Sequence, residues 1–151
     1  MKRSRPDEAK AKAGGKQTTG RVLLAEGDLV LSDMYQTALE DDGWSVEVVH
    51  DGSSAVDRAI ESPPDVFLLN TAPGLEARDL LERIRDHPPT RGLAVILLAN
   101  SGDDPSLQLV EDLEVLAVVV KSRSSRQDLS KTIRRLLESR GRAAEESGQA
   151  G

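Results

Sequence analysis

The chain has 151 residues, no cysteine and a formal net charge of −6 at pH 7. A chain of this length forms one domain whose core is stable without a metal or a disulfide. The lack of cysteine excludes disulfides, thiolate catalysis and zinc sites built on sulfur, and it suits the reducing cytoplasm, where we expect the protein. We expect no signal peptide and no membrane attachment, because no stretch approaches the roughly 20 apolar residues of a membrane span.

Charge is distributed unevenly along the sequence. Residues 1–20 carry six Lys or Arg against two Asp or Glu, whereas residues 21–139 carry 12 against 22. Because residues 21–139 carry a net negative charge, they repel the phosphates of nucleic acids, and we expect the folded core to bind no nucleic acid. Residues 1–20 and 140–151 show no hydrophobic periodicity, which predicts two disordered tails around a domain at 21–139. The basic N-terminal tail can dock on an acidic partner, but a merely solvated arm is the interpretation we favour.

Five short apolar runs alternate with longer amphipathic segments. The runs are rich in Val, Leu and Ile, and most are apolar on both faces, which is typical of strands buried within a parallel sheet. The five predicted strands are Val22–Ala25, Ser45–Val49, Val66–Leu69, Val95–Leu98 and Leu116–Val120.

Helix boundary signals lie between these runs. Capping residues, Gly and Pro delimit the helices, and apolar residues at helical spacing mark their buried faces. In chain order, the first predicted helix is capped by Asp28 and runs to Asp41, before Gly43. The second is capped by Ser53 and ends near Ser62, and the third, at 76–86, buries Ala77, Leu80, Leu81 and Ile84. The fourth is capped by Asp104, with Pro105 at its first position, and the fifth, at 125–139, buries Leu129, Ile133, Leu136 and Leu137.

Strict alternation of strands and helices predicts an α/β fold in which helices cover both faces of a parallel sheet, since each crossover is right-handed. In such sheets ligands bind beyond the carboxyl ends of the strands, at the switch point of the strand order. The residues that follow the strands are therefore the candidate functional residues. They are Glu26-Gly27-Asp28, Asn70-Thr71-Ala72, Ala99-Asn100-Ser101 and Lys121-Ser122.

Four segments, "RVLLAEGD", "DGSSAVDRAIESPPDVFLLN", "PGLEARDLLERIR" and "VVVK", resemble the receiver domain of bacterial two-component response regulators. The resemblance is to the chemotaxis-regulator type and covers roughly residues 21–138. It implies a (βα)5 flavodoxin-like fold: a three-layer sandwich around a five-stranded parallel sheet with strand order 2-1-3-4-5. It also implies a role in phosphorelay signal transduction by protein–protein contact.

In that family, two acidic residues follow the first strand, a phosphate-accepting Asp the third, a Ser or Thr the fourth and a Lys the fifth. The acids hold a Mg²⁺ ion that neutralises the phosphoryl oxygens, and the Lys supports the developing charge. The resemblance implies that the corresponding residues of this chain form a degenerate phosphorylation site, which consists of Glu26, Gly27, Asp28, Asn70, Ala99 and Lys121.

The departures from the family pattern argue against phosphoryl transfer. The amide of Asn70 is a poor nucleophile beside a carboxylate, Gly27 supplies no metal ligand and Ala99 has no hydroxyl. Asp28 is better employed as a helix cap, and without a phosphoryl group Lys121 is expected to pair with Glu26 or Asn70.

The expected switch and loop features differ as well. Val118 stands where the family usually has an aromatic switch residue, and Ser101 lies too far along to replace the missing hydroxyl. Ser122 stands where the family has a cis Pro, so we expect a trans bond there. Pro73 follows position 70 one residue earlier than is usual, which shortens the loop over the site.

We therefore predict a stand-alone pseudo-receiver that is not an enzyme and uses no catalytic residue, metal or cofactor. Its expected partners are signalling proteins or a second copy of the chain. The resemblance implies a contact surface on the fourth helix, fifth strand and fifth helix, which the family uses for dimers and output partners. In this chain it would carry Glu111, Asp112, Lys131, Arg134 and Arg135, although a merely solvated helix face is equally compatible.

Two alternatives remain. The first is a working phosphorelay receiver with an unconventional acceptor, such as Thr71 or deamidated Asn70, or with a non-phosphate ligand as its switch. The second is an enzyme or flavin protein on the same fold. The sequence has no Gly-rich phosphate loop, and its three aromatic residues do not gather at the expected site, which disfavours a flavin.

Overall fold

The computed structural model describes residues 20–70, 77–99, 108–121 and 126–150. Its centre is one five-stranded sheet in which every pair of neighbouring strands is parallel, with the order β2-β1-β3-β4-β5. The strands are β1 (Gly20–Ala25), β2 (Trp44–Val49), β3 (Val66–Asn70), β4 (Ala94–Ala99) and β5 (Ala117–Val120). The predicted flavodoxin-like fold and strand order are confirmed, and the predicted strand ends differ by at most two residues.

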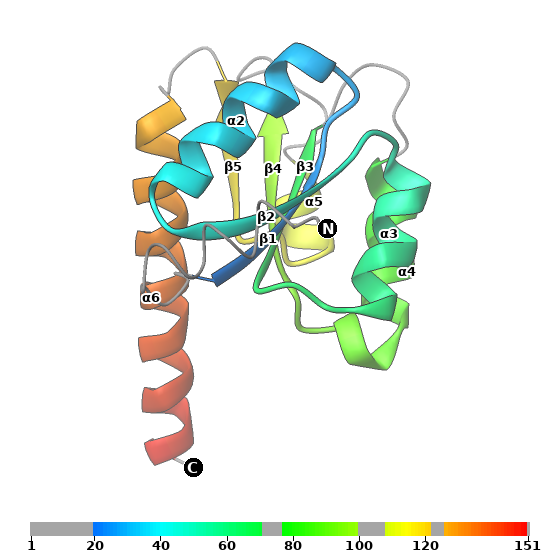
Figure 1. Cartoon of the computed structure of the whole chain (residues 1–151). Coiled ribbons are helices and arrows are strands. Elements are labelled where there is room, and N and C mark those ends of the chain that lie inside the picture. The colour runs from blue at the N-terminus through cyan, green and yellow to red at the C-terminus, as the bar shows by residue number, and fades with distance from the viewer. Residues whose placement is uncertain (1–19, 71–76, 100–107, 122–125, 151) are drawn as a thin grey trace, which may run out of the picture.

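Helices cover both faces of the sheet, which makes three layers (Figure 1). On one face, α2 (Leu29–Asp41) and α6 (Arg126–Ala150) pack on strand residues such as Leu24 and Leu68. On the other, α3 (Gly52–Glu61), α4 (Ala77–Asp86) and the short α5 (Leu109–Asp112) pack on residues such as Phe67 and Leu97. A 3₁₀ turn, η1 (Pro88–Thr90), connects α4 to β4. β3 and β4 are buried along their whole length, as expected for strands covered on both sides.

The boundaries of α2 match the prediction. The side chain of Asp28 accepts a hydrogen bond from the backbone N–H of Leu31 at 2.9 Å, which satisfies one free donor of the first turn. Gly43 follows the helix with φ of 99°, a conformation that residues with a Cβ rarely adopt. In α4, all four residues predicted to face the core are buried.

The N-cap of α3 corrects the sequence prediction. Asp51, not Ser53, holds this position, and its carboxylate accepts a hydrogen bond from Ser54 N at 2.8 Å. Asp-Gly-Ser-Ser offers several capping side chains in a row, and the earlier carboxylate takes the role.

The C-terminal helix is also longer than predicted. α6 continues past Ser139 to Ala150, where the sequence predicts a disordered tail from residue 140. On the inward face of this helix, Leu129 and Ile133 are buried, and Leu136 and Leu137 are partly buried. The predicted N-terminal tail and the predicted Asp104 cap lie outside the described residues.

A polar cluster fastens α6 to the turn between α2 and β2. Trp44 Nε1 donates to Ser130 Oγ at 3.0 Å, Ser130 Oγ donates to Asp42, and Arg134 pairs with Asp42. Trp44 and Ser130 are both buried. These four residues, here called the α6 anchor, join segments nearly ninety residues apart in the sequence.

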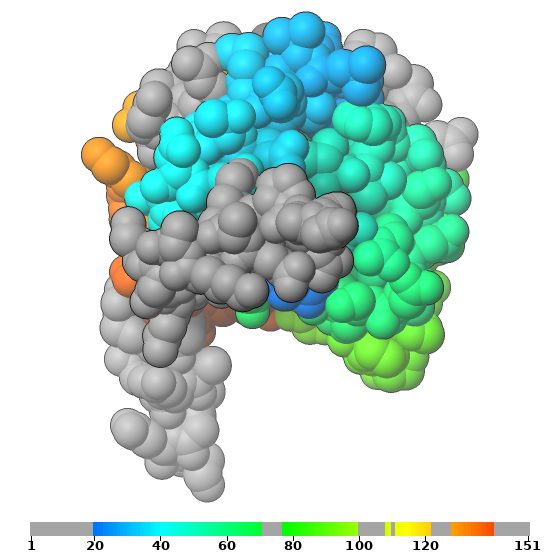
Figure 2. Space-filling model, viewed as in Figure 1, coloured from blue at the N-terminus to red at the C-terminus, as the bar shows by residue number. Residues whose placement is uncertain are grey.

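The surface of the described residues exposes few large apolar side chains. Leu29 and Val30, in the first turn of α2, are the large hydrophobic residues that stand exposed there. Figure 2 shows this helix, blue to cyan, on the visible face next to α3. Within the same residues, no helix combines the length and apolar character needed to cross a bilayer.

Candidate functional site

Three polar residues meet at the carboxyl edge of the sheet: Glu26 just after β1, Asn70 at the end of β3 and Lys121 just after β5. They lie at the switch point of the strand order. β1 lies between β2 and β3, so the connections on its two sides run in opposite directions. The structure therefore brings together the residues that the sequence predicts, and we call these three the site cluster.

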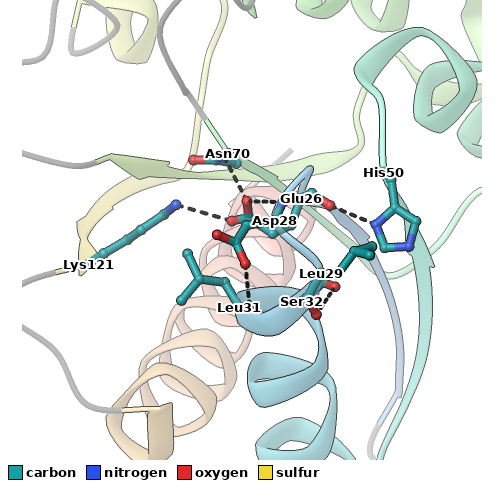
Figure 3. A network of polar contacts seen from close by, with 8 residues as sticks. All are labelled: Glu26, Asp28, Leu29, Leu31, Ser32, His50, Asn70 and Lys121. Carbon is teal, nitrogen blue, oxygen red and sulfur yellow. Dashed lines mark hydrogen bonds and ion pairs between the residues drawn. The ribbon is translucent and has the colours of Figure 1, made fainter.

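Glu26 is the centre of the site cluster (Figure 3). Its side chain is only 2% exposed. Oε1 accepts from Lys121 Nζ at 3.1 Å, and Oε2 accepts from Asn70 Nδ2 at 3.0 Å and from the backbone N–H of Asp28 at 3.1 Å. The Lys121 ammonium compensates the buried carboxylate, so the predicted pairing of Lys121 with Glu26 is confirmed.

Asn70 is held in one orientation by this carboxylate. Glu26 Oε2 can only accept, so the amide nitrogen faces it and the amide oxygen turns away, as Figure 3 shows. Asn70 is 7% exposed, and its Oδ1 is a buried atom without a hydrogen-bond partner. Among the described residues it is the one buried side-chain atom in this condition. Such an unpaired acceptor costs about 1–3 kcal/mol.

A cavity of about 340 Å³ opens beside the site cluster. Besides the three cluster residues, its lining includes Asp28, His50 and Asp51. The imidazole Nδ1 of His50 lies 3.0 Å from the backbone oxygen of Glu26, which makes it the protonated ring nitrogen. The backbone N–H of Ser54, and then its side chain, lower the pKa of Asp51. The cavity is therefore lined by three carboxylates and one ammonium.

The oxygen donors at this edge do not fit a Mg²⁺ ion. Both oxygens of Glu26 already accept hydrogen bonds, and the carboxylate of Asp28 caps α2. Gly27 adds no side-chain ligand, although a Cβ there would meet nothing closer than His50 O at 3.4 Å. Mg²⁺ demands near-ideal octahedral oxygen coordination and gives up water reluctantly. No group of three or more His, Asp or Glu in the described residues is placed to hold a metal.

The remaining predicted site positions offer little chemistry. Ala99 is fully buried at the end of β4. Val118, at the expected switch position, is partly buried against the core on the α3 and α4 side. Thr71, Ser101 and Ser122 lie outside the described residues, and so does the loop that Pro73 shortens.

Two of the five predicted partner-binding residues have ion-pair partners within the chain. Asp112 accepts from Arg78 Nη2 at 2.8 Å, and Arg134 belongs to the α6 anchor. Glu111, Lys131 and Arg135 are exposed.

Sequence reasoning missed two contributors to the site. Asp51 and His50 line the cavity, but the sequence shows them only as residues that follow β2. The signal that could have found them is their place after a strand adjacent to β1, since the carboxyl ends of neighbouring parallel strands share one edge.

Comparison with known proteins relates the chain to response regulators, although no family model matches it. The Mycobacterium tuberculosis protein named Probable transcriptional regulatory protein TcrX is 36% identical over 88 residues, which are 58% of this chain and 36% of that protein. The chain spans 26–38% of the length of the first curated relatives it matches.

Solved structures show the same fold. The chemotaxis response regulator CheY4 of Vibrio cholerae superposes with a TM-score of 0.69 at 20% identity, over 80% of this chain and 99% of that one. A structure from a family of streptococcal redox sensors, described as evolved from two-component response regulators, gives a TM-score of 0.72 at 22% identity. It covers 83% of this chain and 54% of the other.

Proposed function

Because the folded part of this chain is a receiver domain of the response-regulator type, we propose that it is a pseudo-receiver. It signals in the cytoplasm through protein–protein contact, without aspartyl phosphorylation. The observation that carries the proposal is Asn70, a buried amide that occupies the acceptor position and donates its N–H to Glu26.

The chemistry of the site cluster supports this proposal. A neutral amide cannot form the acyl phosphate that a carboxylate forms. The ammonium of Lys121 lies 3.1 Å from Glu26, where its charge serves a carboxylate inside the protein rather than an incoming phosphoryl group. The donor set suits Mg²⁺ poorly, and phosphoryl transfer relies on that ion to neutralise the transferring oxygens.

The test is incubation with acetyl phosphate and Mg²⁺, followed by intact mass. We expect no phosphoryl adduct on the natural chain. The matched control is the double variant Gly27→Asp/Asn70→Asp, which restores the carboxylates at positions where the backbone leaves room for a Cβ. This variant should gain the adduct if the two missing carboxylates are the cause. An adduct on the natural chain would disprove the proposal.

The main alternative is a receiver that still switches, through an unconventional phosphate acceptor or a non-phosphate ligand. An unconventional acceptor predicts an adduct in the same experiment, located by fragmentation. A non-phosphate ligand would use the cavity that Glu26, Asn70 and Lys121 line. The redox sensors with this fold give a precedent for a changed input, although this chain has no cysteine for thiol chemistry.

The proposed contact surface is formed by α5, β5 and α6. Exposed Glu111 on α5 and exposed Lys131 and Arg135 on α6 offer opposite charges that can pair across a two-fold axis. Sedimentation at low and high salt measures this. A homodimer held by these charges should dissociate more readily at high salt, because salt screens the charges. A monomer in both conditions, at a protein concentration of about 50 μM, would rule out this dimer.

A further inference from the structure

We propose that Arg85 is a positioning residue for the contact surface: it holds the turn between α5 and β5 in one conformation and thereby fixes the place of α5. The inference deepens the proposed function and rests on it, because α5 and β5 belong to the contact surface proposed above. A partner would then meet a surface that is always presented, rather than one that a signal at the site cluster must first rearrange.

The guanidinium of Arg85, near the C-terminal end of α4, donates to four backbone oxygens. Two of them belong to the turn after α5, where Nε donates to Leu113 O at 2.9 Å and Nη2 to Glu114 O at 3.1 Å. The other two precede β4, where Nη1 donates to Arg91 O at 2.9 Å and to Leu93 O at 2.8 Å. The planar group fixes the directions of its donors, so one side chain joins both segments to α4. These four hydrogen bonds are here called the Arg85 clamp.

Burial strengthens the Arg85 clamp. Arg85 is half-buried, and burial lowers the pKa of its guanidinium, which nevertheless keeps its charge as arginines in proteins do. A charged donor removed from water needs acceptors inside the protein, and hydrogen bonds to charged groups contribute more than those between neutral groups. Opening the turn would therefore leave a partly desolvated charge without two of its acceptors.

The turn itself has a backbone conformation that needs support. Glu114 has φ of 55°, and among the described residues it is the one residue other than glycine with a positive φ. A residue with a Cβ is disfavoured in this left-handed region, and it persists there where the surrounding structure holds it. The carbonyl oxygen of Glu114 is one of the acceptors of Arg85. The Arg85 clamp thus acts on the residue of the turn that is least stable in its conformation.

A second arginine of α4 contacts α5 itself. Arg78 Nη2 lies 2.8 Å from Asp112 Oδ2, and Arg78 precedes Arg85 by seven residues, which places both on one face of α4. At the other end of α5, Leu109 is buried in the core. With a core contact at its start and two arginines at its end, α5 holds the exposed Glu111 in one place.

The first experiment uses the natural chain. NMR relaxation dispersion on backbone amides detects exchange between conformations on the microsecond-to-millisecond timescale. We expect flat profiles at residues 109–120. Spectra at two protein concentrations separate switching from self-association, because only association depends on concentration. Exchange at these residues that is independent of concentration would overturn the inference.

The second experiment measures hydrogen exchange at two amides of the turn. Leu113 N donates to Leu109 O at 3.0 Å, and Leu116 N donates to Val95 O at 2.8 Å, so both amides are protected until the turn opens. The amides of β1, which lies inside the sheet, report general unfolding. The ratio of the two exchange rates therefore measures local opening alone.

Variants of α4 test the assignment. Arg85→Met keeps the apolar stem and removes the donors, and it should raise exchange at the turn relative to β1 by about tenfold or more. Arg85→Lys keeps the charge without the planar fork and should raise the ratio by about threefold or more. The matched control is Arg83→Met, which breaks an exposed ion pair of the same helix with Asp57 and should leave the ratio unchanged.

The conformation of Glu114 provides a rescue that a general loss of stability would not show. Glycine adopts a positive φ without steric cost, so Glu114→Gly in the Arg85→Met background should lower exchange at the turn again by about threefold or more. Glu114→Gln removes the same charge but keeps the Cβ, and it should give no rescue.

An unchanged ratio in Arg85→Met would overturn the inference, and so would an equal rise at β1 and at the turn, because Arg85 would then contribute only general stability. If Arg85→Met does not fold, the same two outcomes in Arg85→Lys decide the question. None of these results concerns the pseudo-receiver proposal, which depends on the phosphorylation experiment. A phosphoryl adduct on the natural chain would remove that proposal and leave the measured rigidity of the turn unaffected.

Discussion

The α6 anchor and the site cluster both join residues that lie far apart in the sequence, and they differ in how completely their polar atoms are paired. In the α6 anchor, the indole N–H of Trp44, the hydroxyl of Ser130 and the carboxylate of Asp42 all have partners. In the site cluster, Glu26 is fully engaged while Asn70 Oδ1 has none. A cavity accompanies the second cluster.

The difference indicates two uses of buried polarity. Buried polar groups are retained at a cost, and a fully paired network stabilises one arrangement of the chain. The α6 anchor has this character, because each contact holds α6 to the α2–β2 turn. The site cluster keeps one buried acceptor unpaired, at a cost in stability that the α6 anchor does not carry.

The largest expected effect comes from breaking the ion pair of the site cluster. Lys121→Met leaves the buried Glu26 carboxylate uncompensated and should lower the free energy of unfolding by about 3 kcal/mol, measured by urea titration. The control is Arg83→Met, which breaks an exposed pair with Asp57 and should cost less than about 1 kcal/mol. Equal losses in the two variants would show that the burial of Glu26 has no energetic weight.

The next effect should come from the α6 anchor. Ser130→Ala leaves the buried Trp44 N–H without its acceptor and should cost about 1–2 kcal/mol of unfolding free energy. Trp44 is the single tryptophan, so a change in its emission spectrum reports the altered contact directly. Ser53→Ala, on the exposed start of α3, should stay within about 0.5 kcal/mol. An unchanged spectrum in Ser130→Ala would contradict the assigned hydrogen bond.

Asn70→Leu should change stability less than either of these substitutions. It loses the amide bond to Glu26 but also removes the unpaired oxygen, and the two effects are opposite in sign and similar in size. The free energy of unfolding should therefore change by less than about 1 kcal/mol. A loss above about 2 kcal/mol would mean that Oδ1 has a partner in the folded protein.

The smallest effect concerns pH. Hydrogen bonds from Ser54 lower the pKa of Asp51, so its ionised cap stabilises the fold above its unfolded pKa, and this contribution is lost as pH falls through the lower folded value. Asp51→Asn keeps the cap without the titration. Urea midpoints of the two proteins from pH 5 to pH 2, the window around the ordinary Asp pKa of about 4, should show the natural chain losing relative stability on acidification. If the urea midpoints of the two proteins changed in parallel with pH, the stabilising role of the ionised Asp51 cap would be refuted.

The fold could be predicted from the sequence because it depends on local patterns. Runs such as Val66–Leu69 are apolar on both faces, and Asp28 and Gly43 mark the ends of α2 through backbone chemistry that acts within a few residues. The resemblance to receiver domains then supplied the strand order and placed Asn70 beside Glu26.

The details of the site were less predictable because they depend on contacts between distant segments. The sequence allows Lys121 to pair with either Glu26 or Asn70. In the structure Lys121 pairs with Glu26, and the amide oxygen of Asn70 has no partner. The role of Ser130 depends on Trp44, 86 residues away in the sequence. The extension of α6 to Ala150 was missed because its sequence lacks an apolar stripe.

The length of α6 gives the domain a lever. Its 25 residues extend about 37 Å, whereas the strands, of six residues at most, extend about 20 Å, so the distal end of the helix projects past the sheet (Figure 1). Contacts hold the helix as far as Arg140, whose guanidinium donates to the backbone oxygen of Gly92, and about 15 Å of helix lies beyond that residue. A tilt of about 10° at Arg140 would move the far end by about 3 Å, so a small change in the packing at Arg140 becomes a larger displacement at the end of the helix.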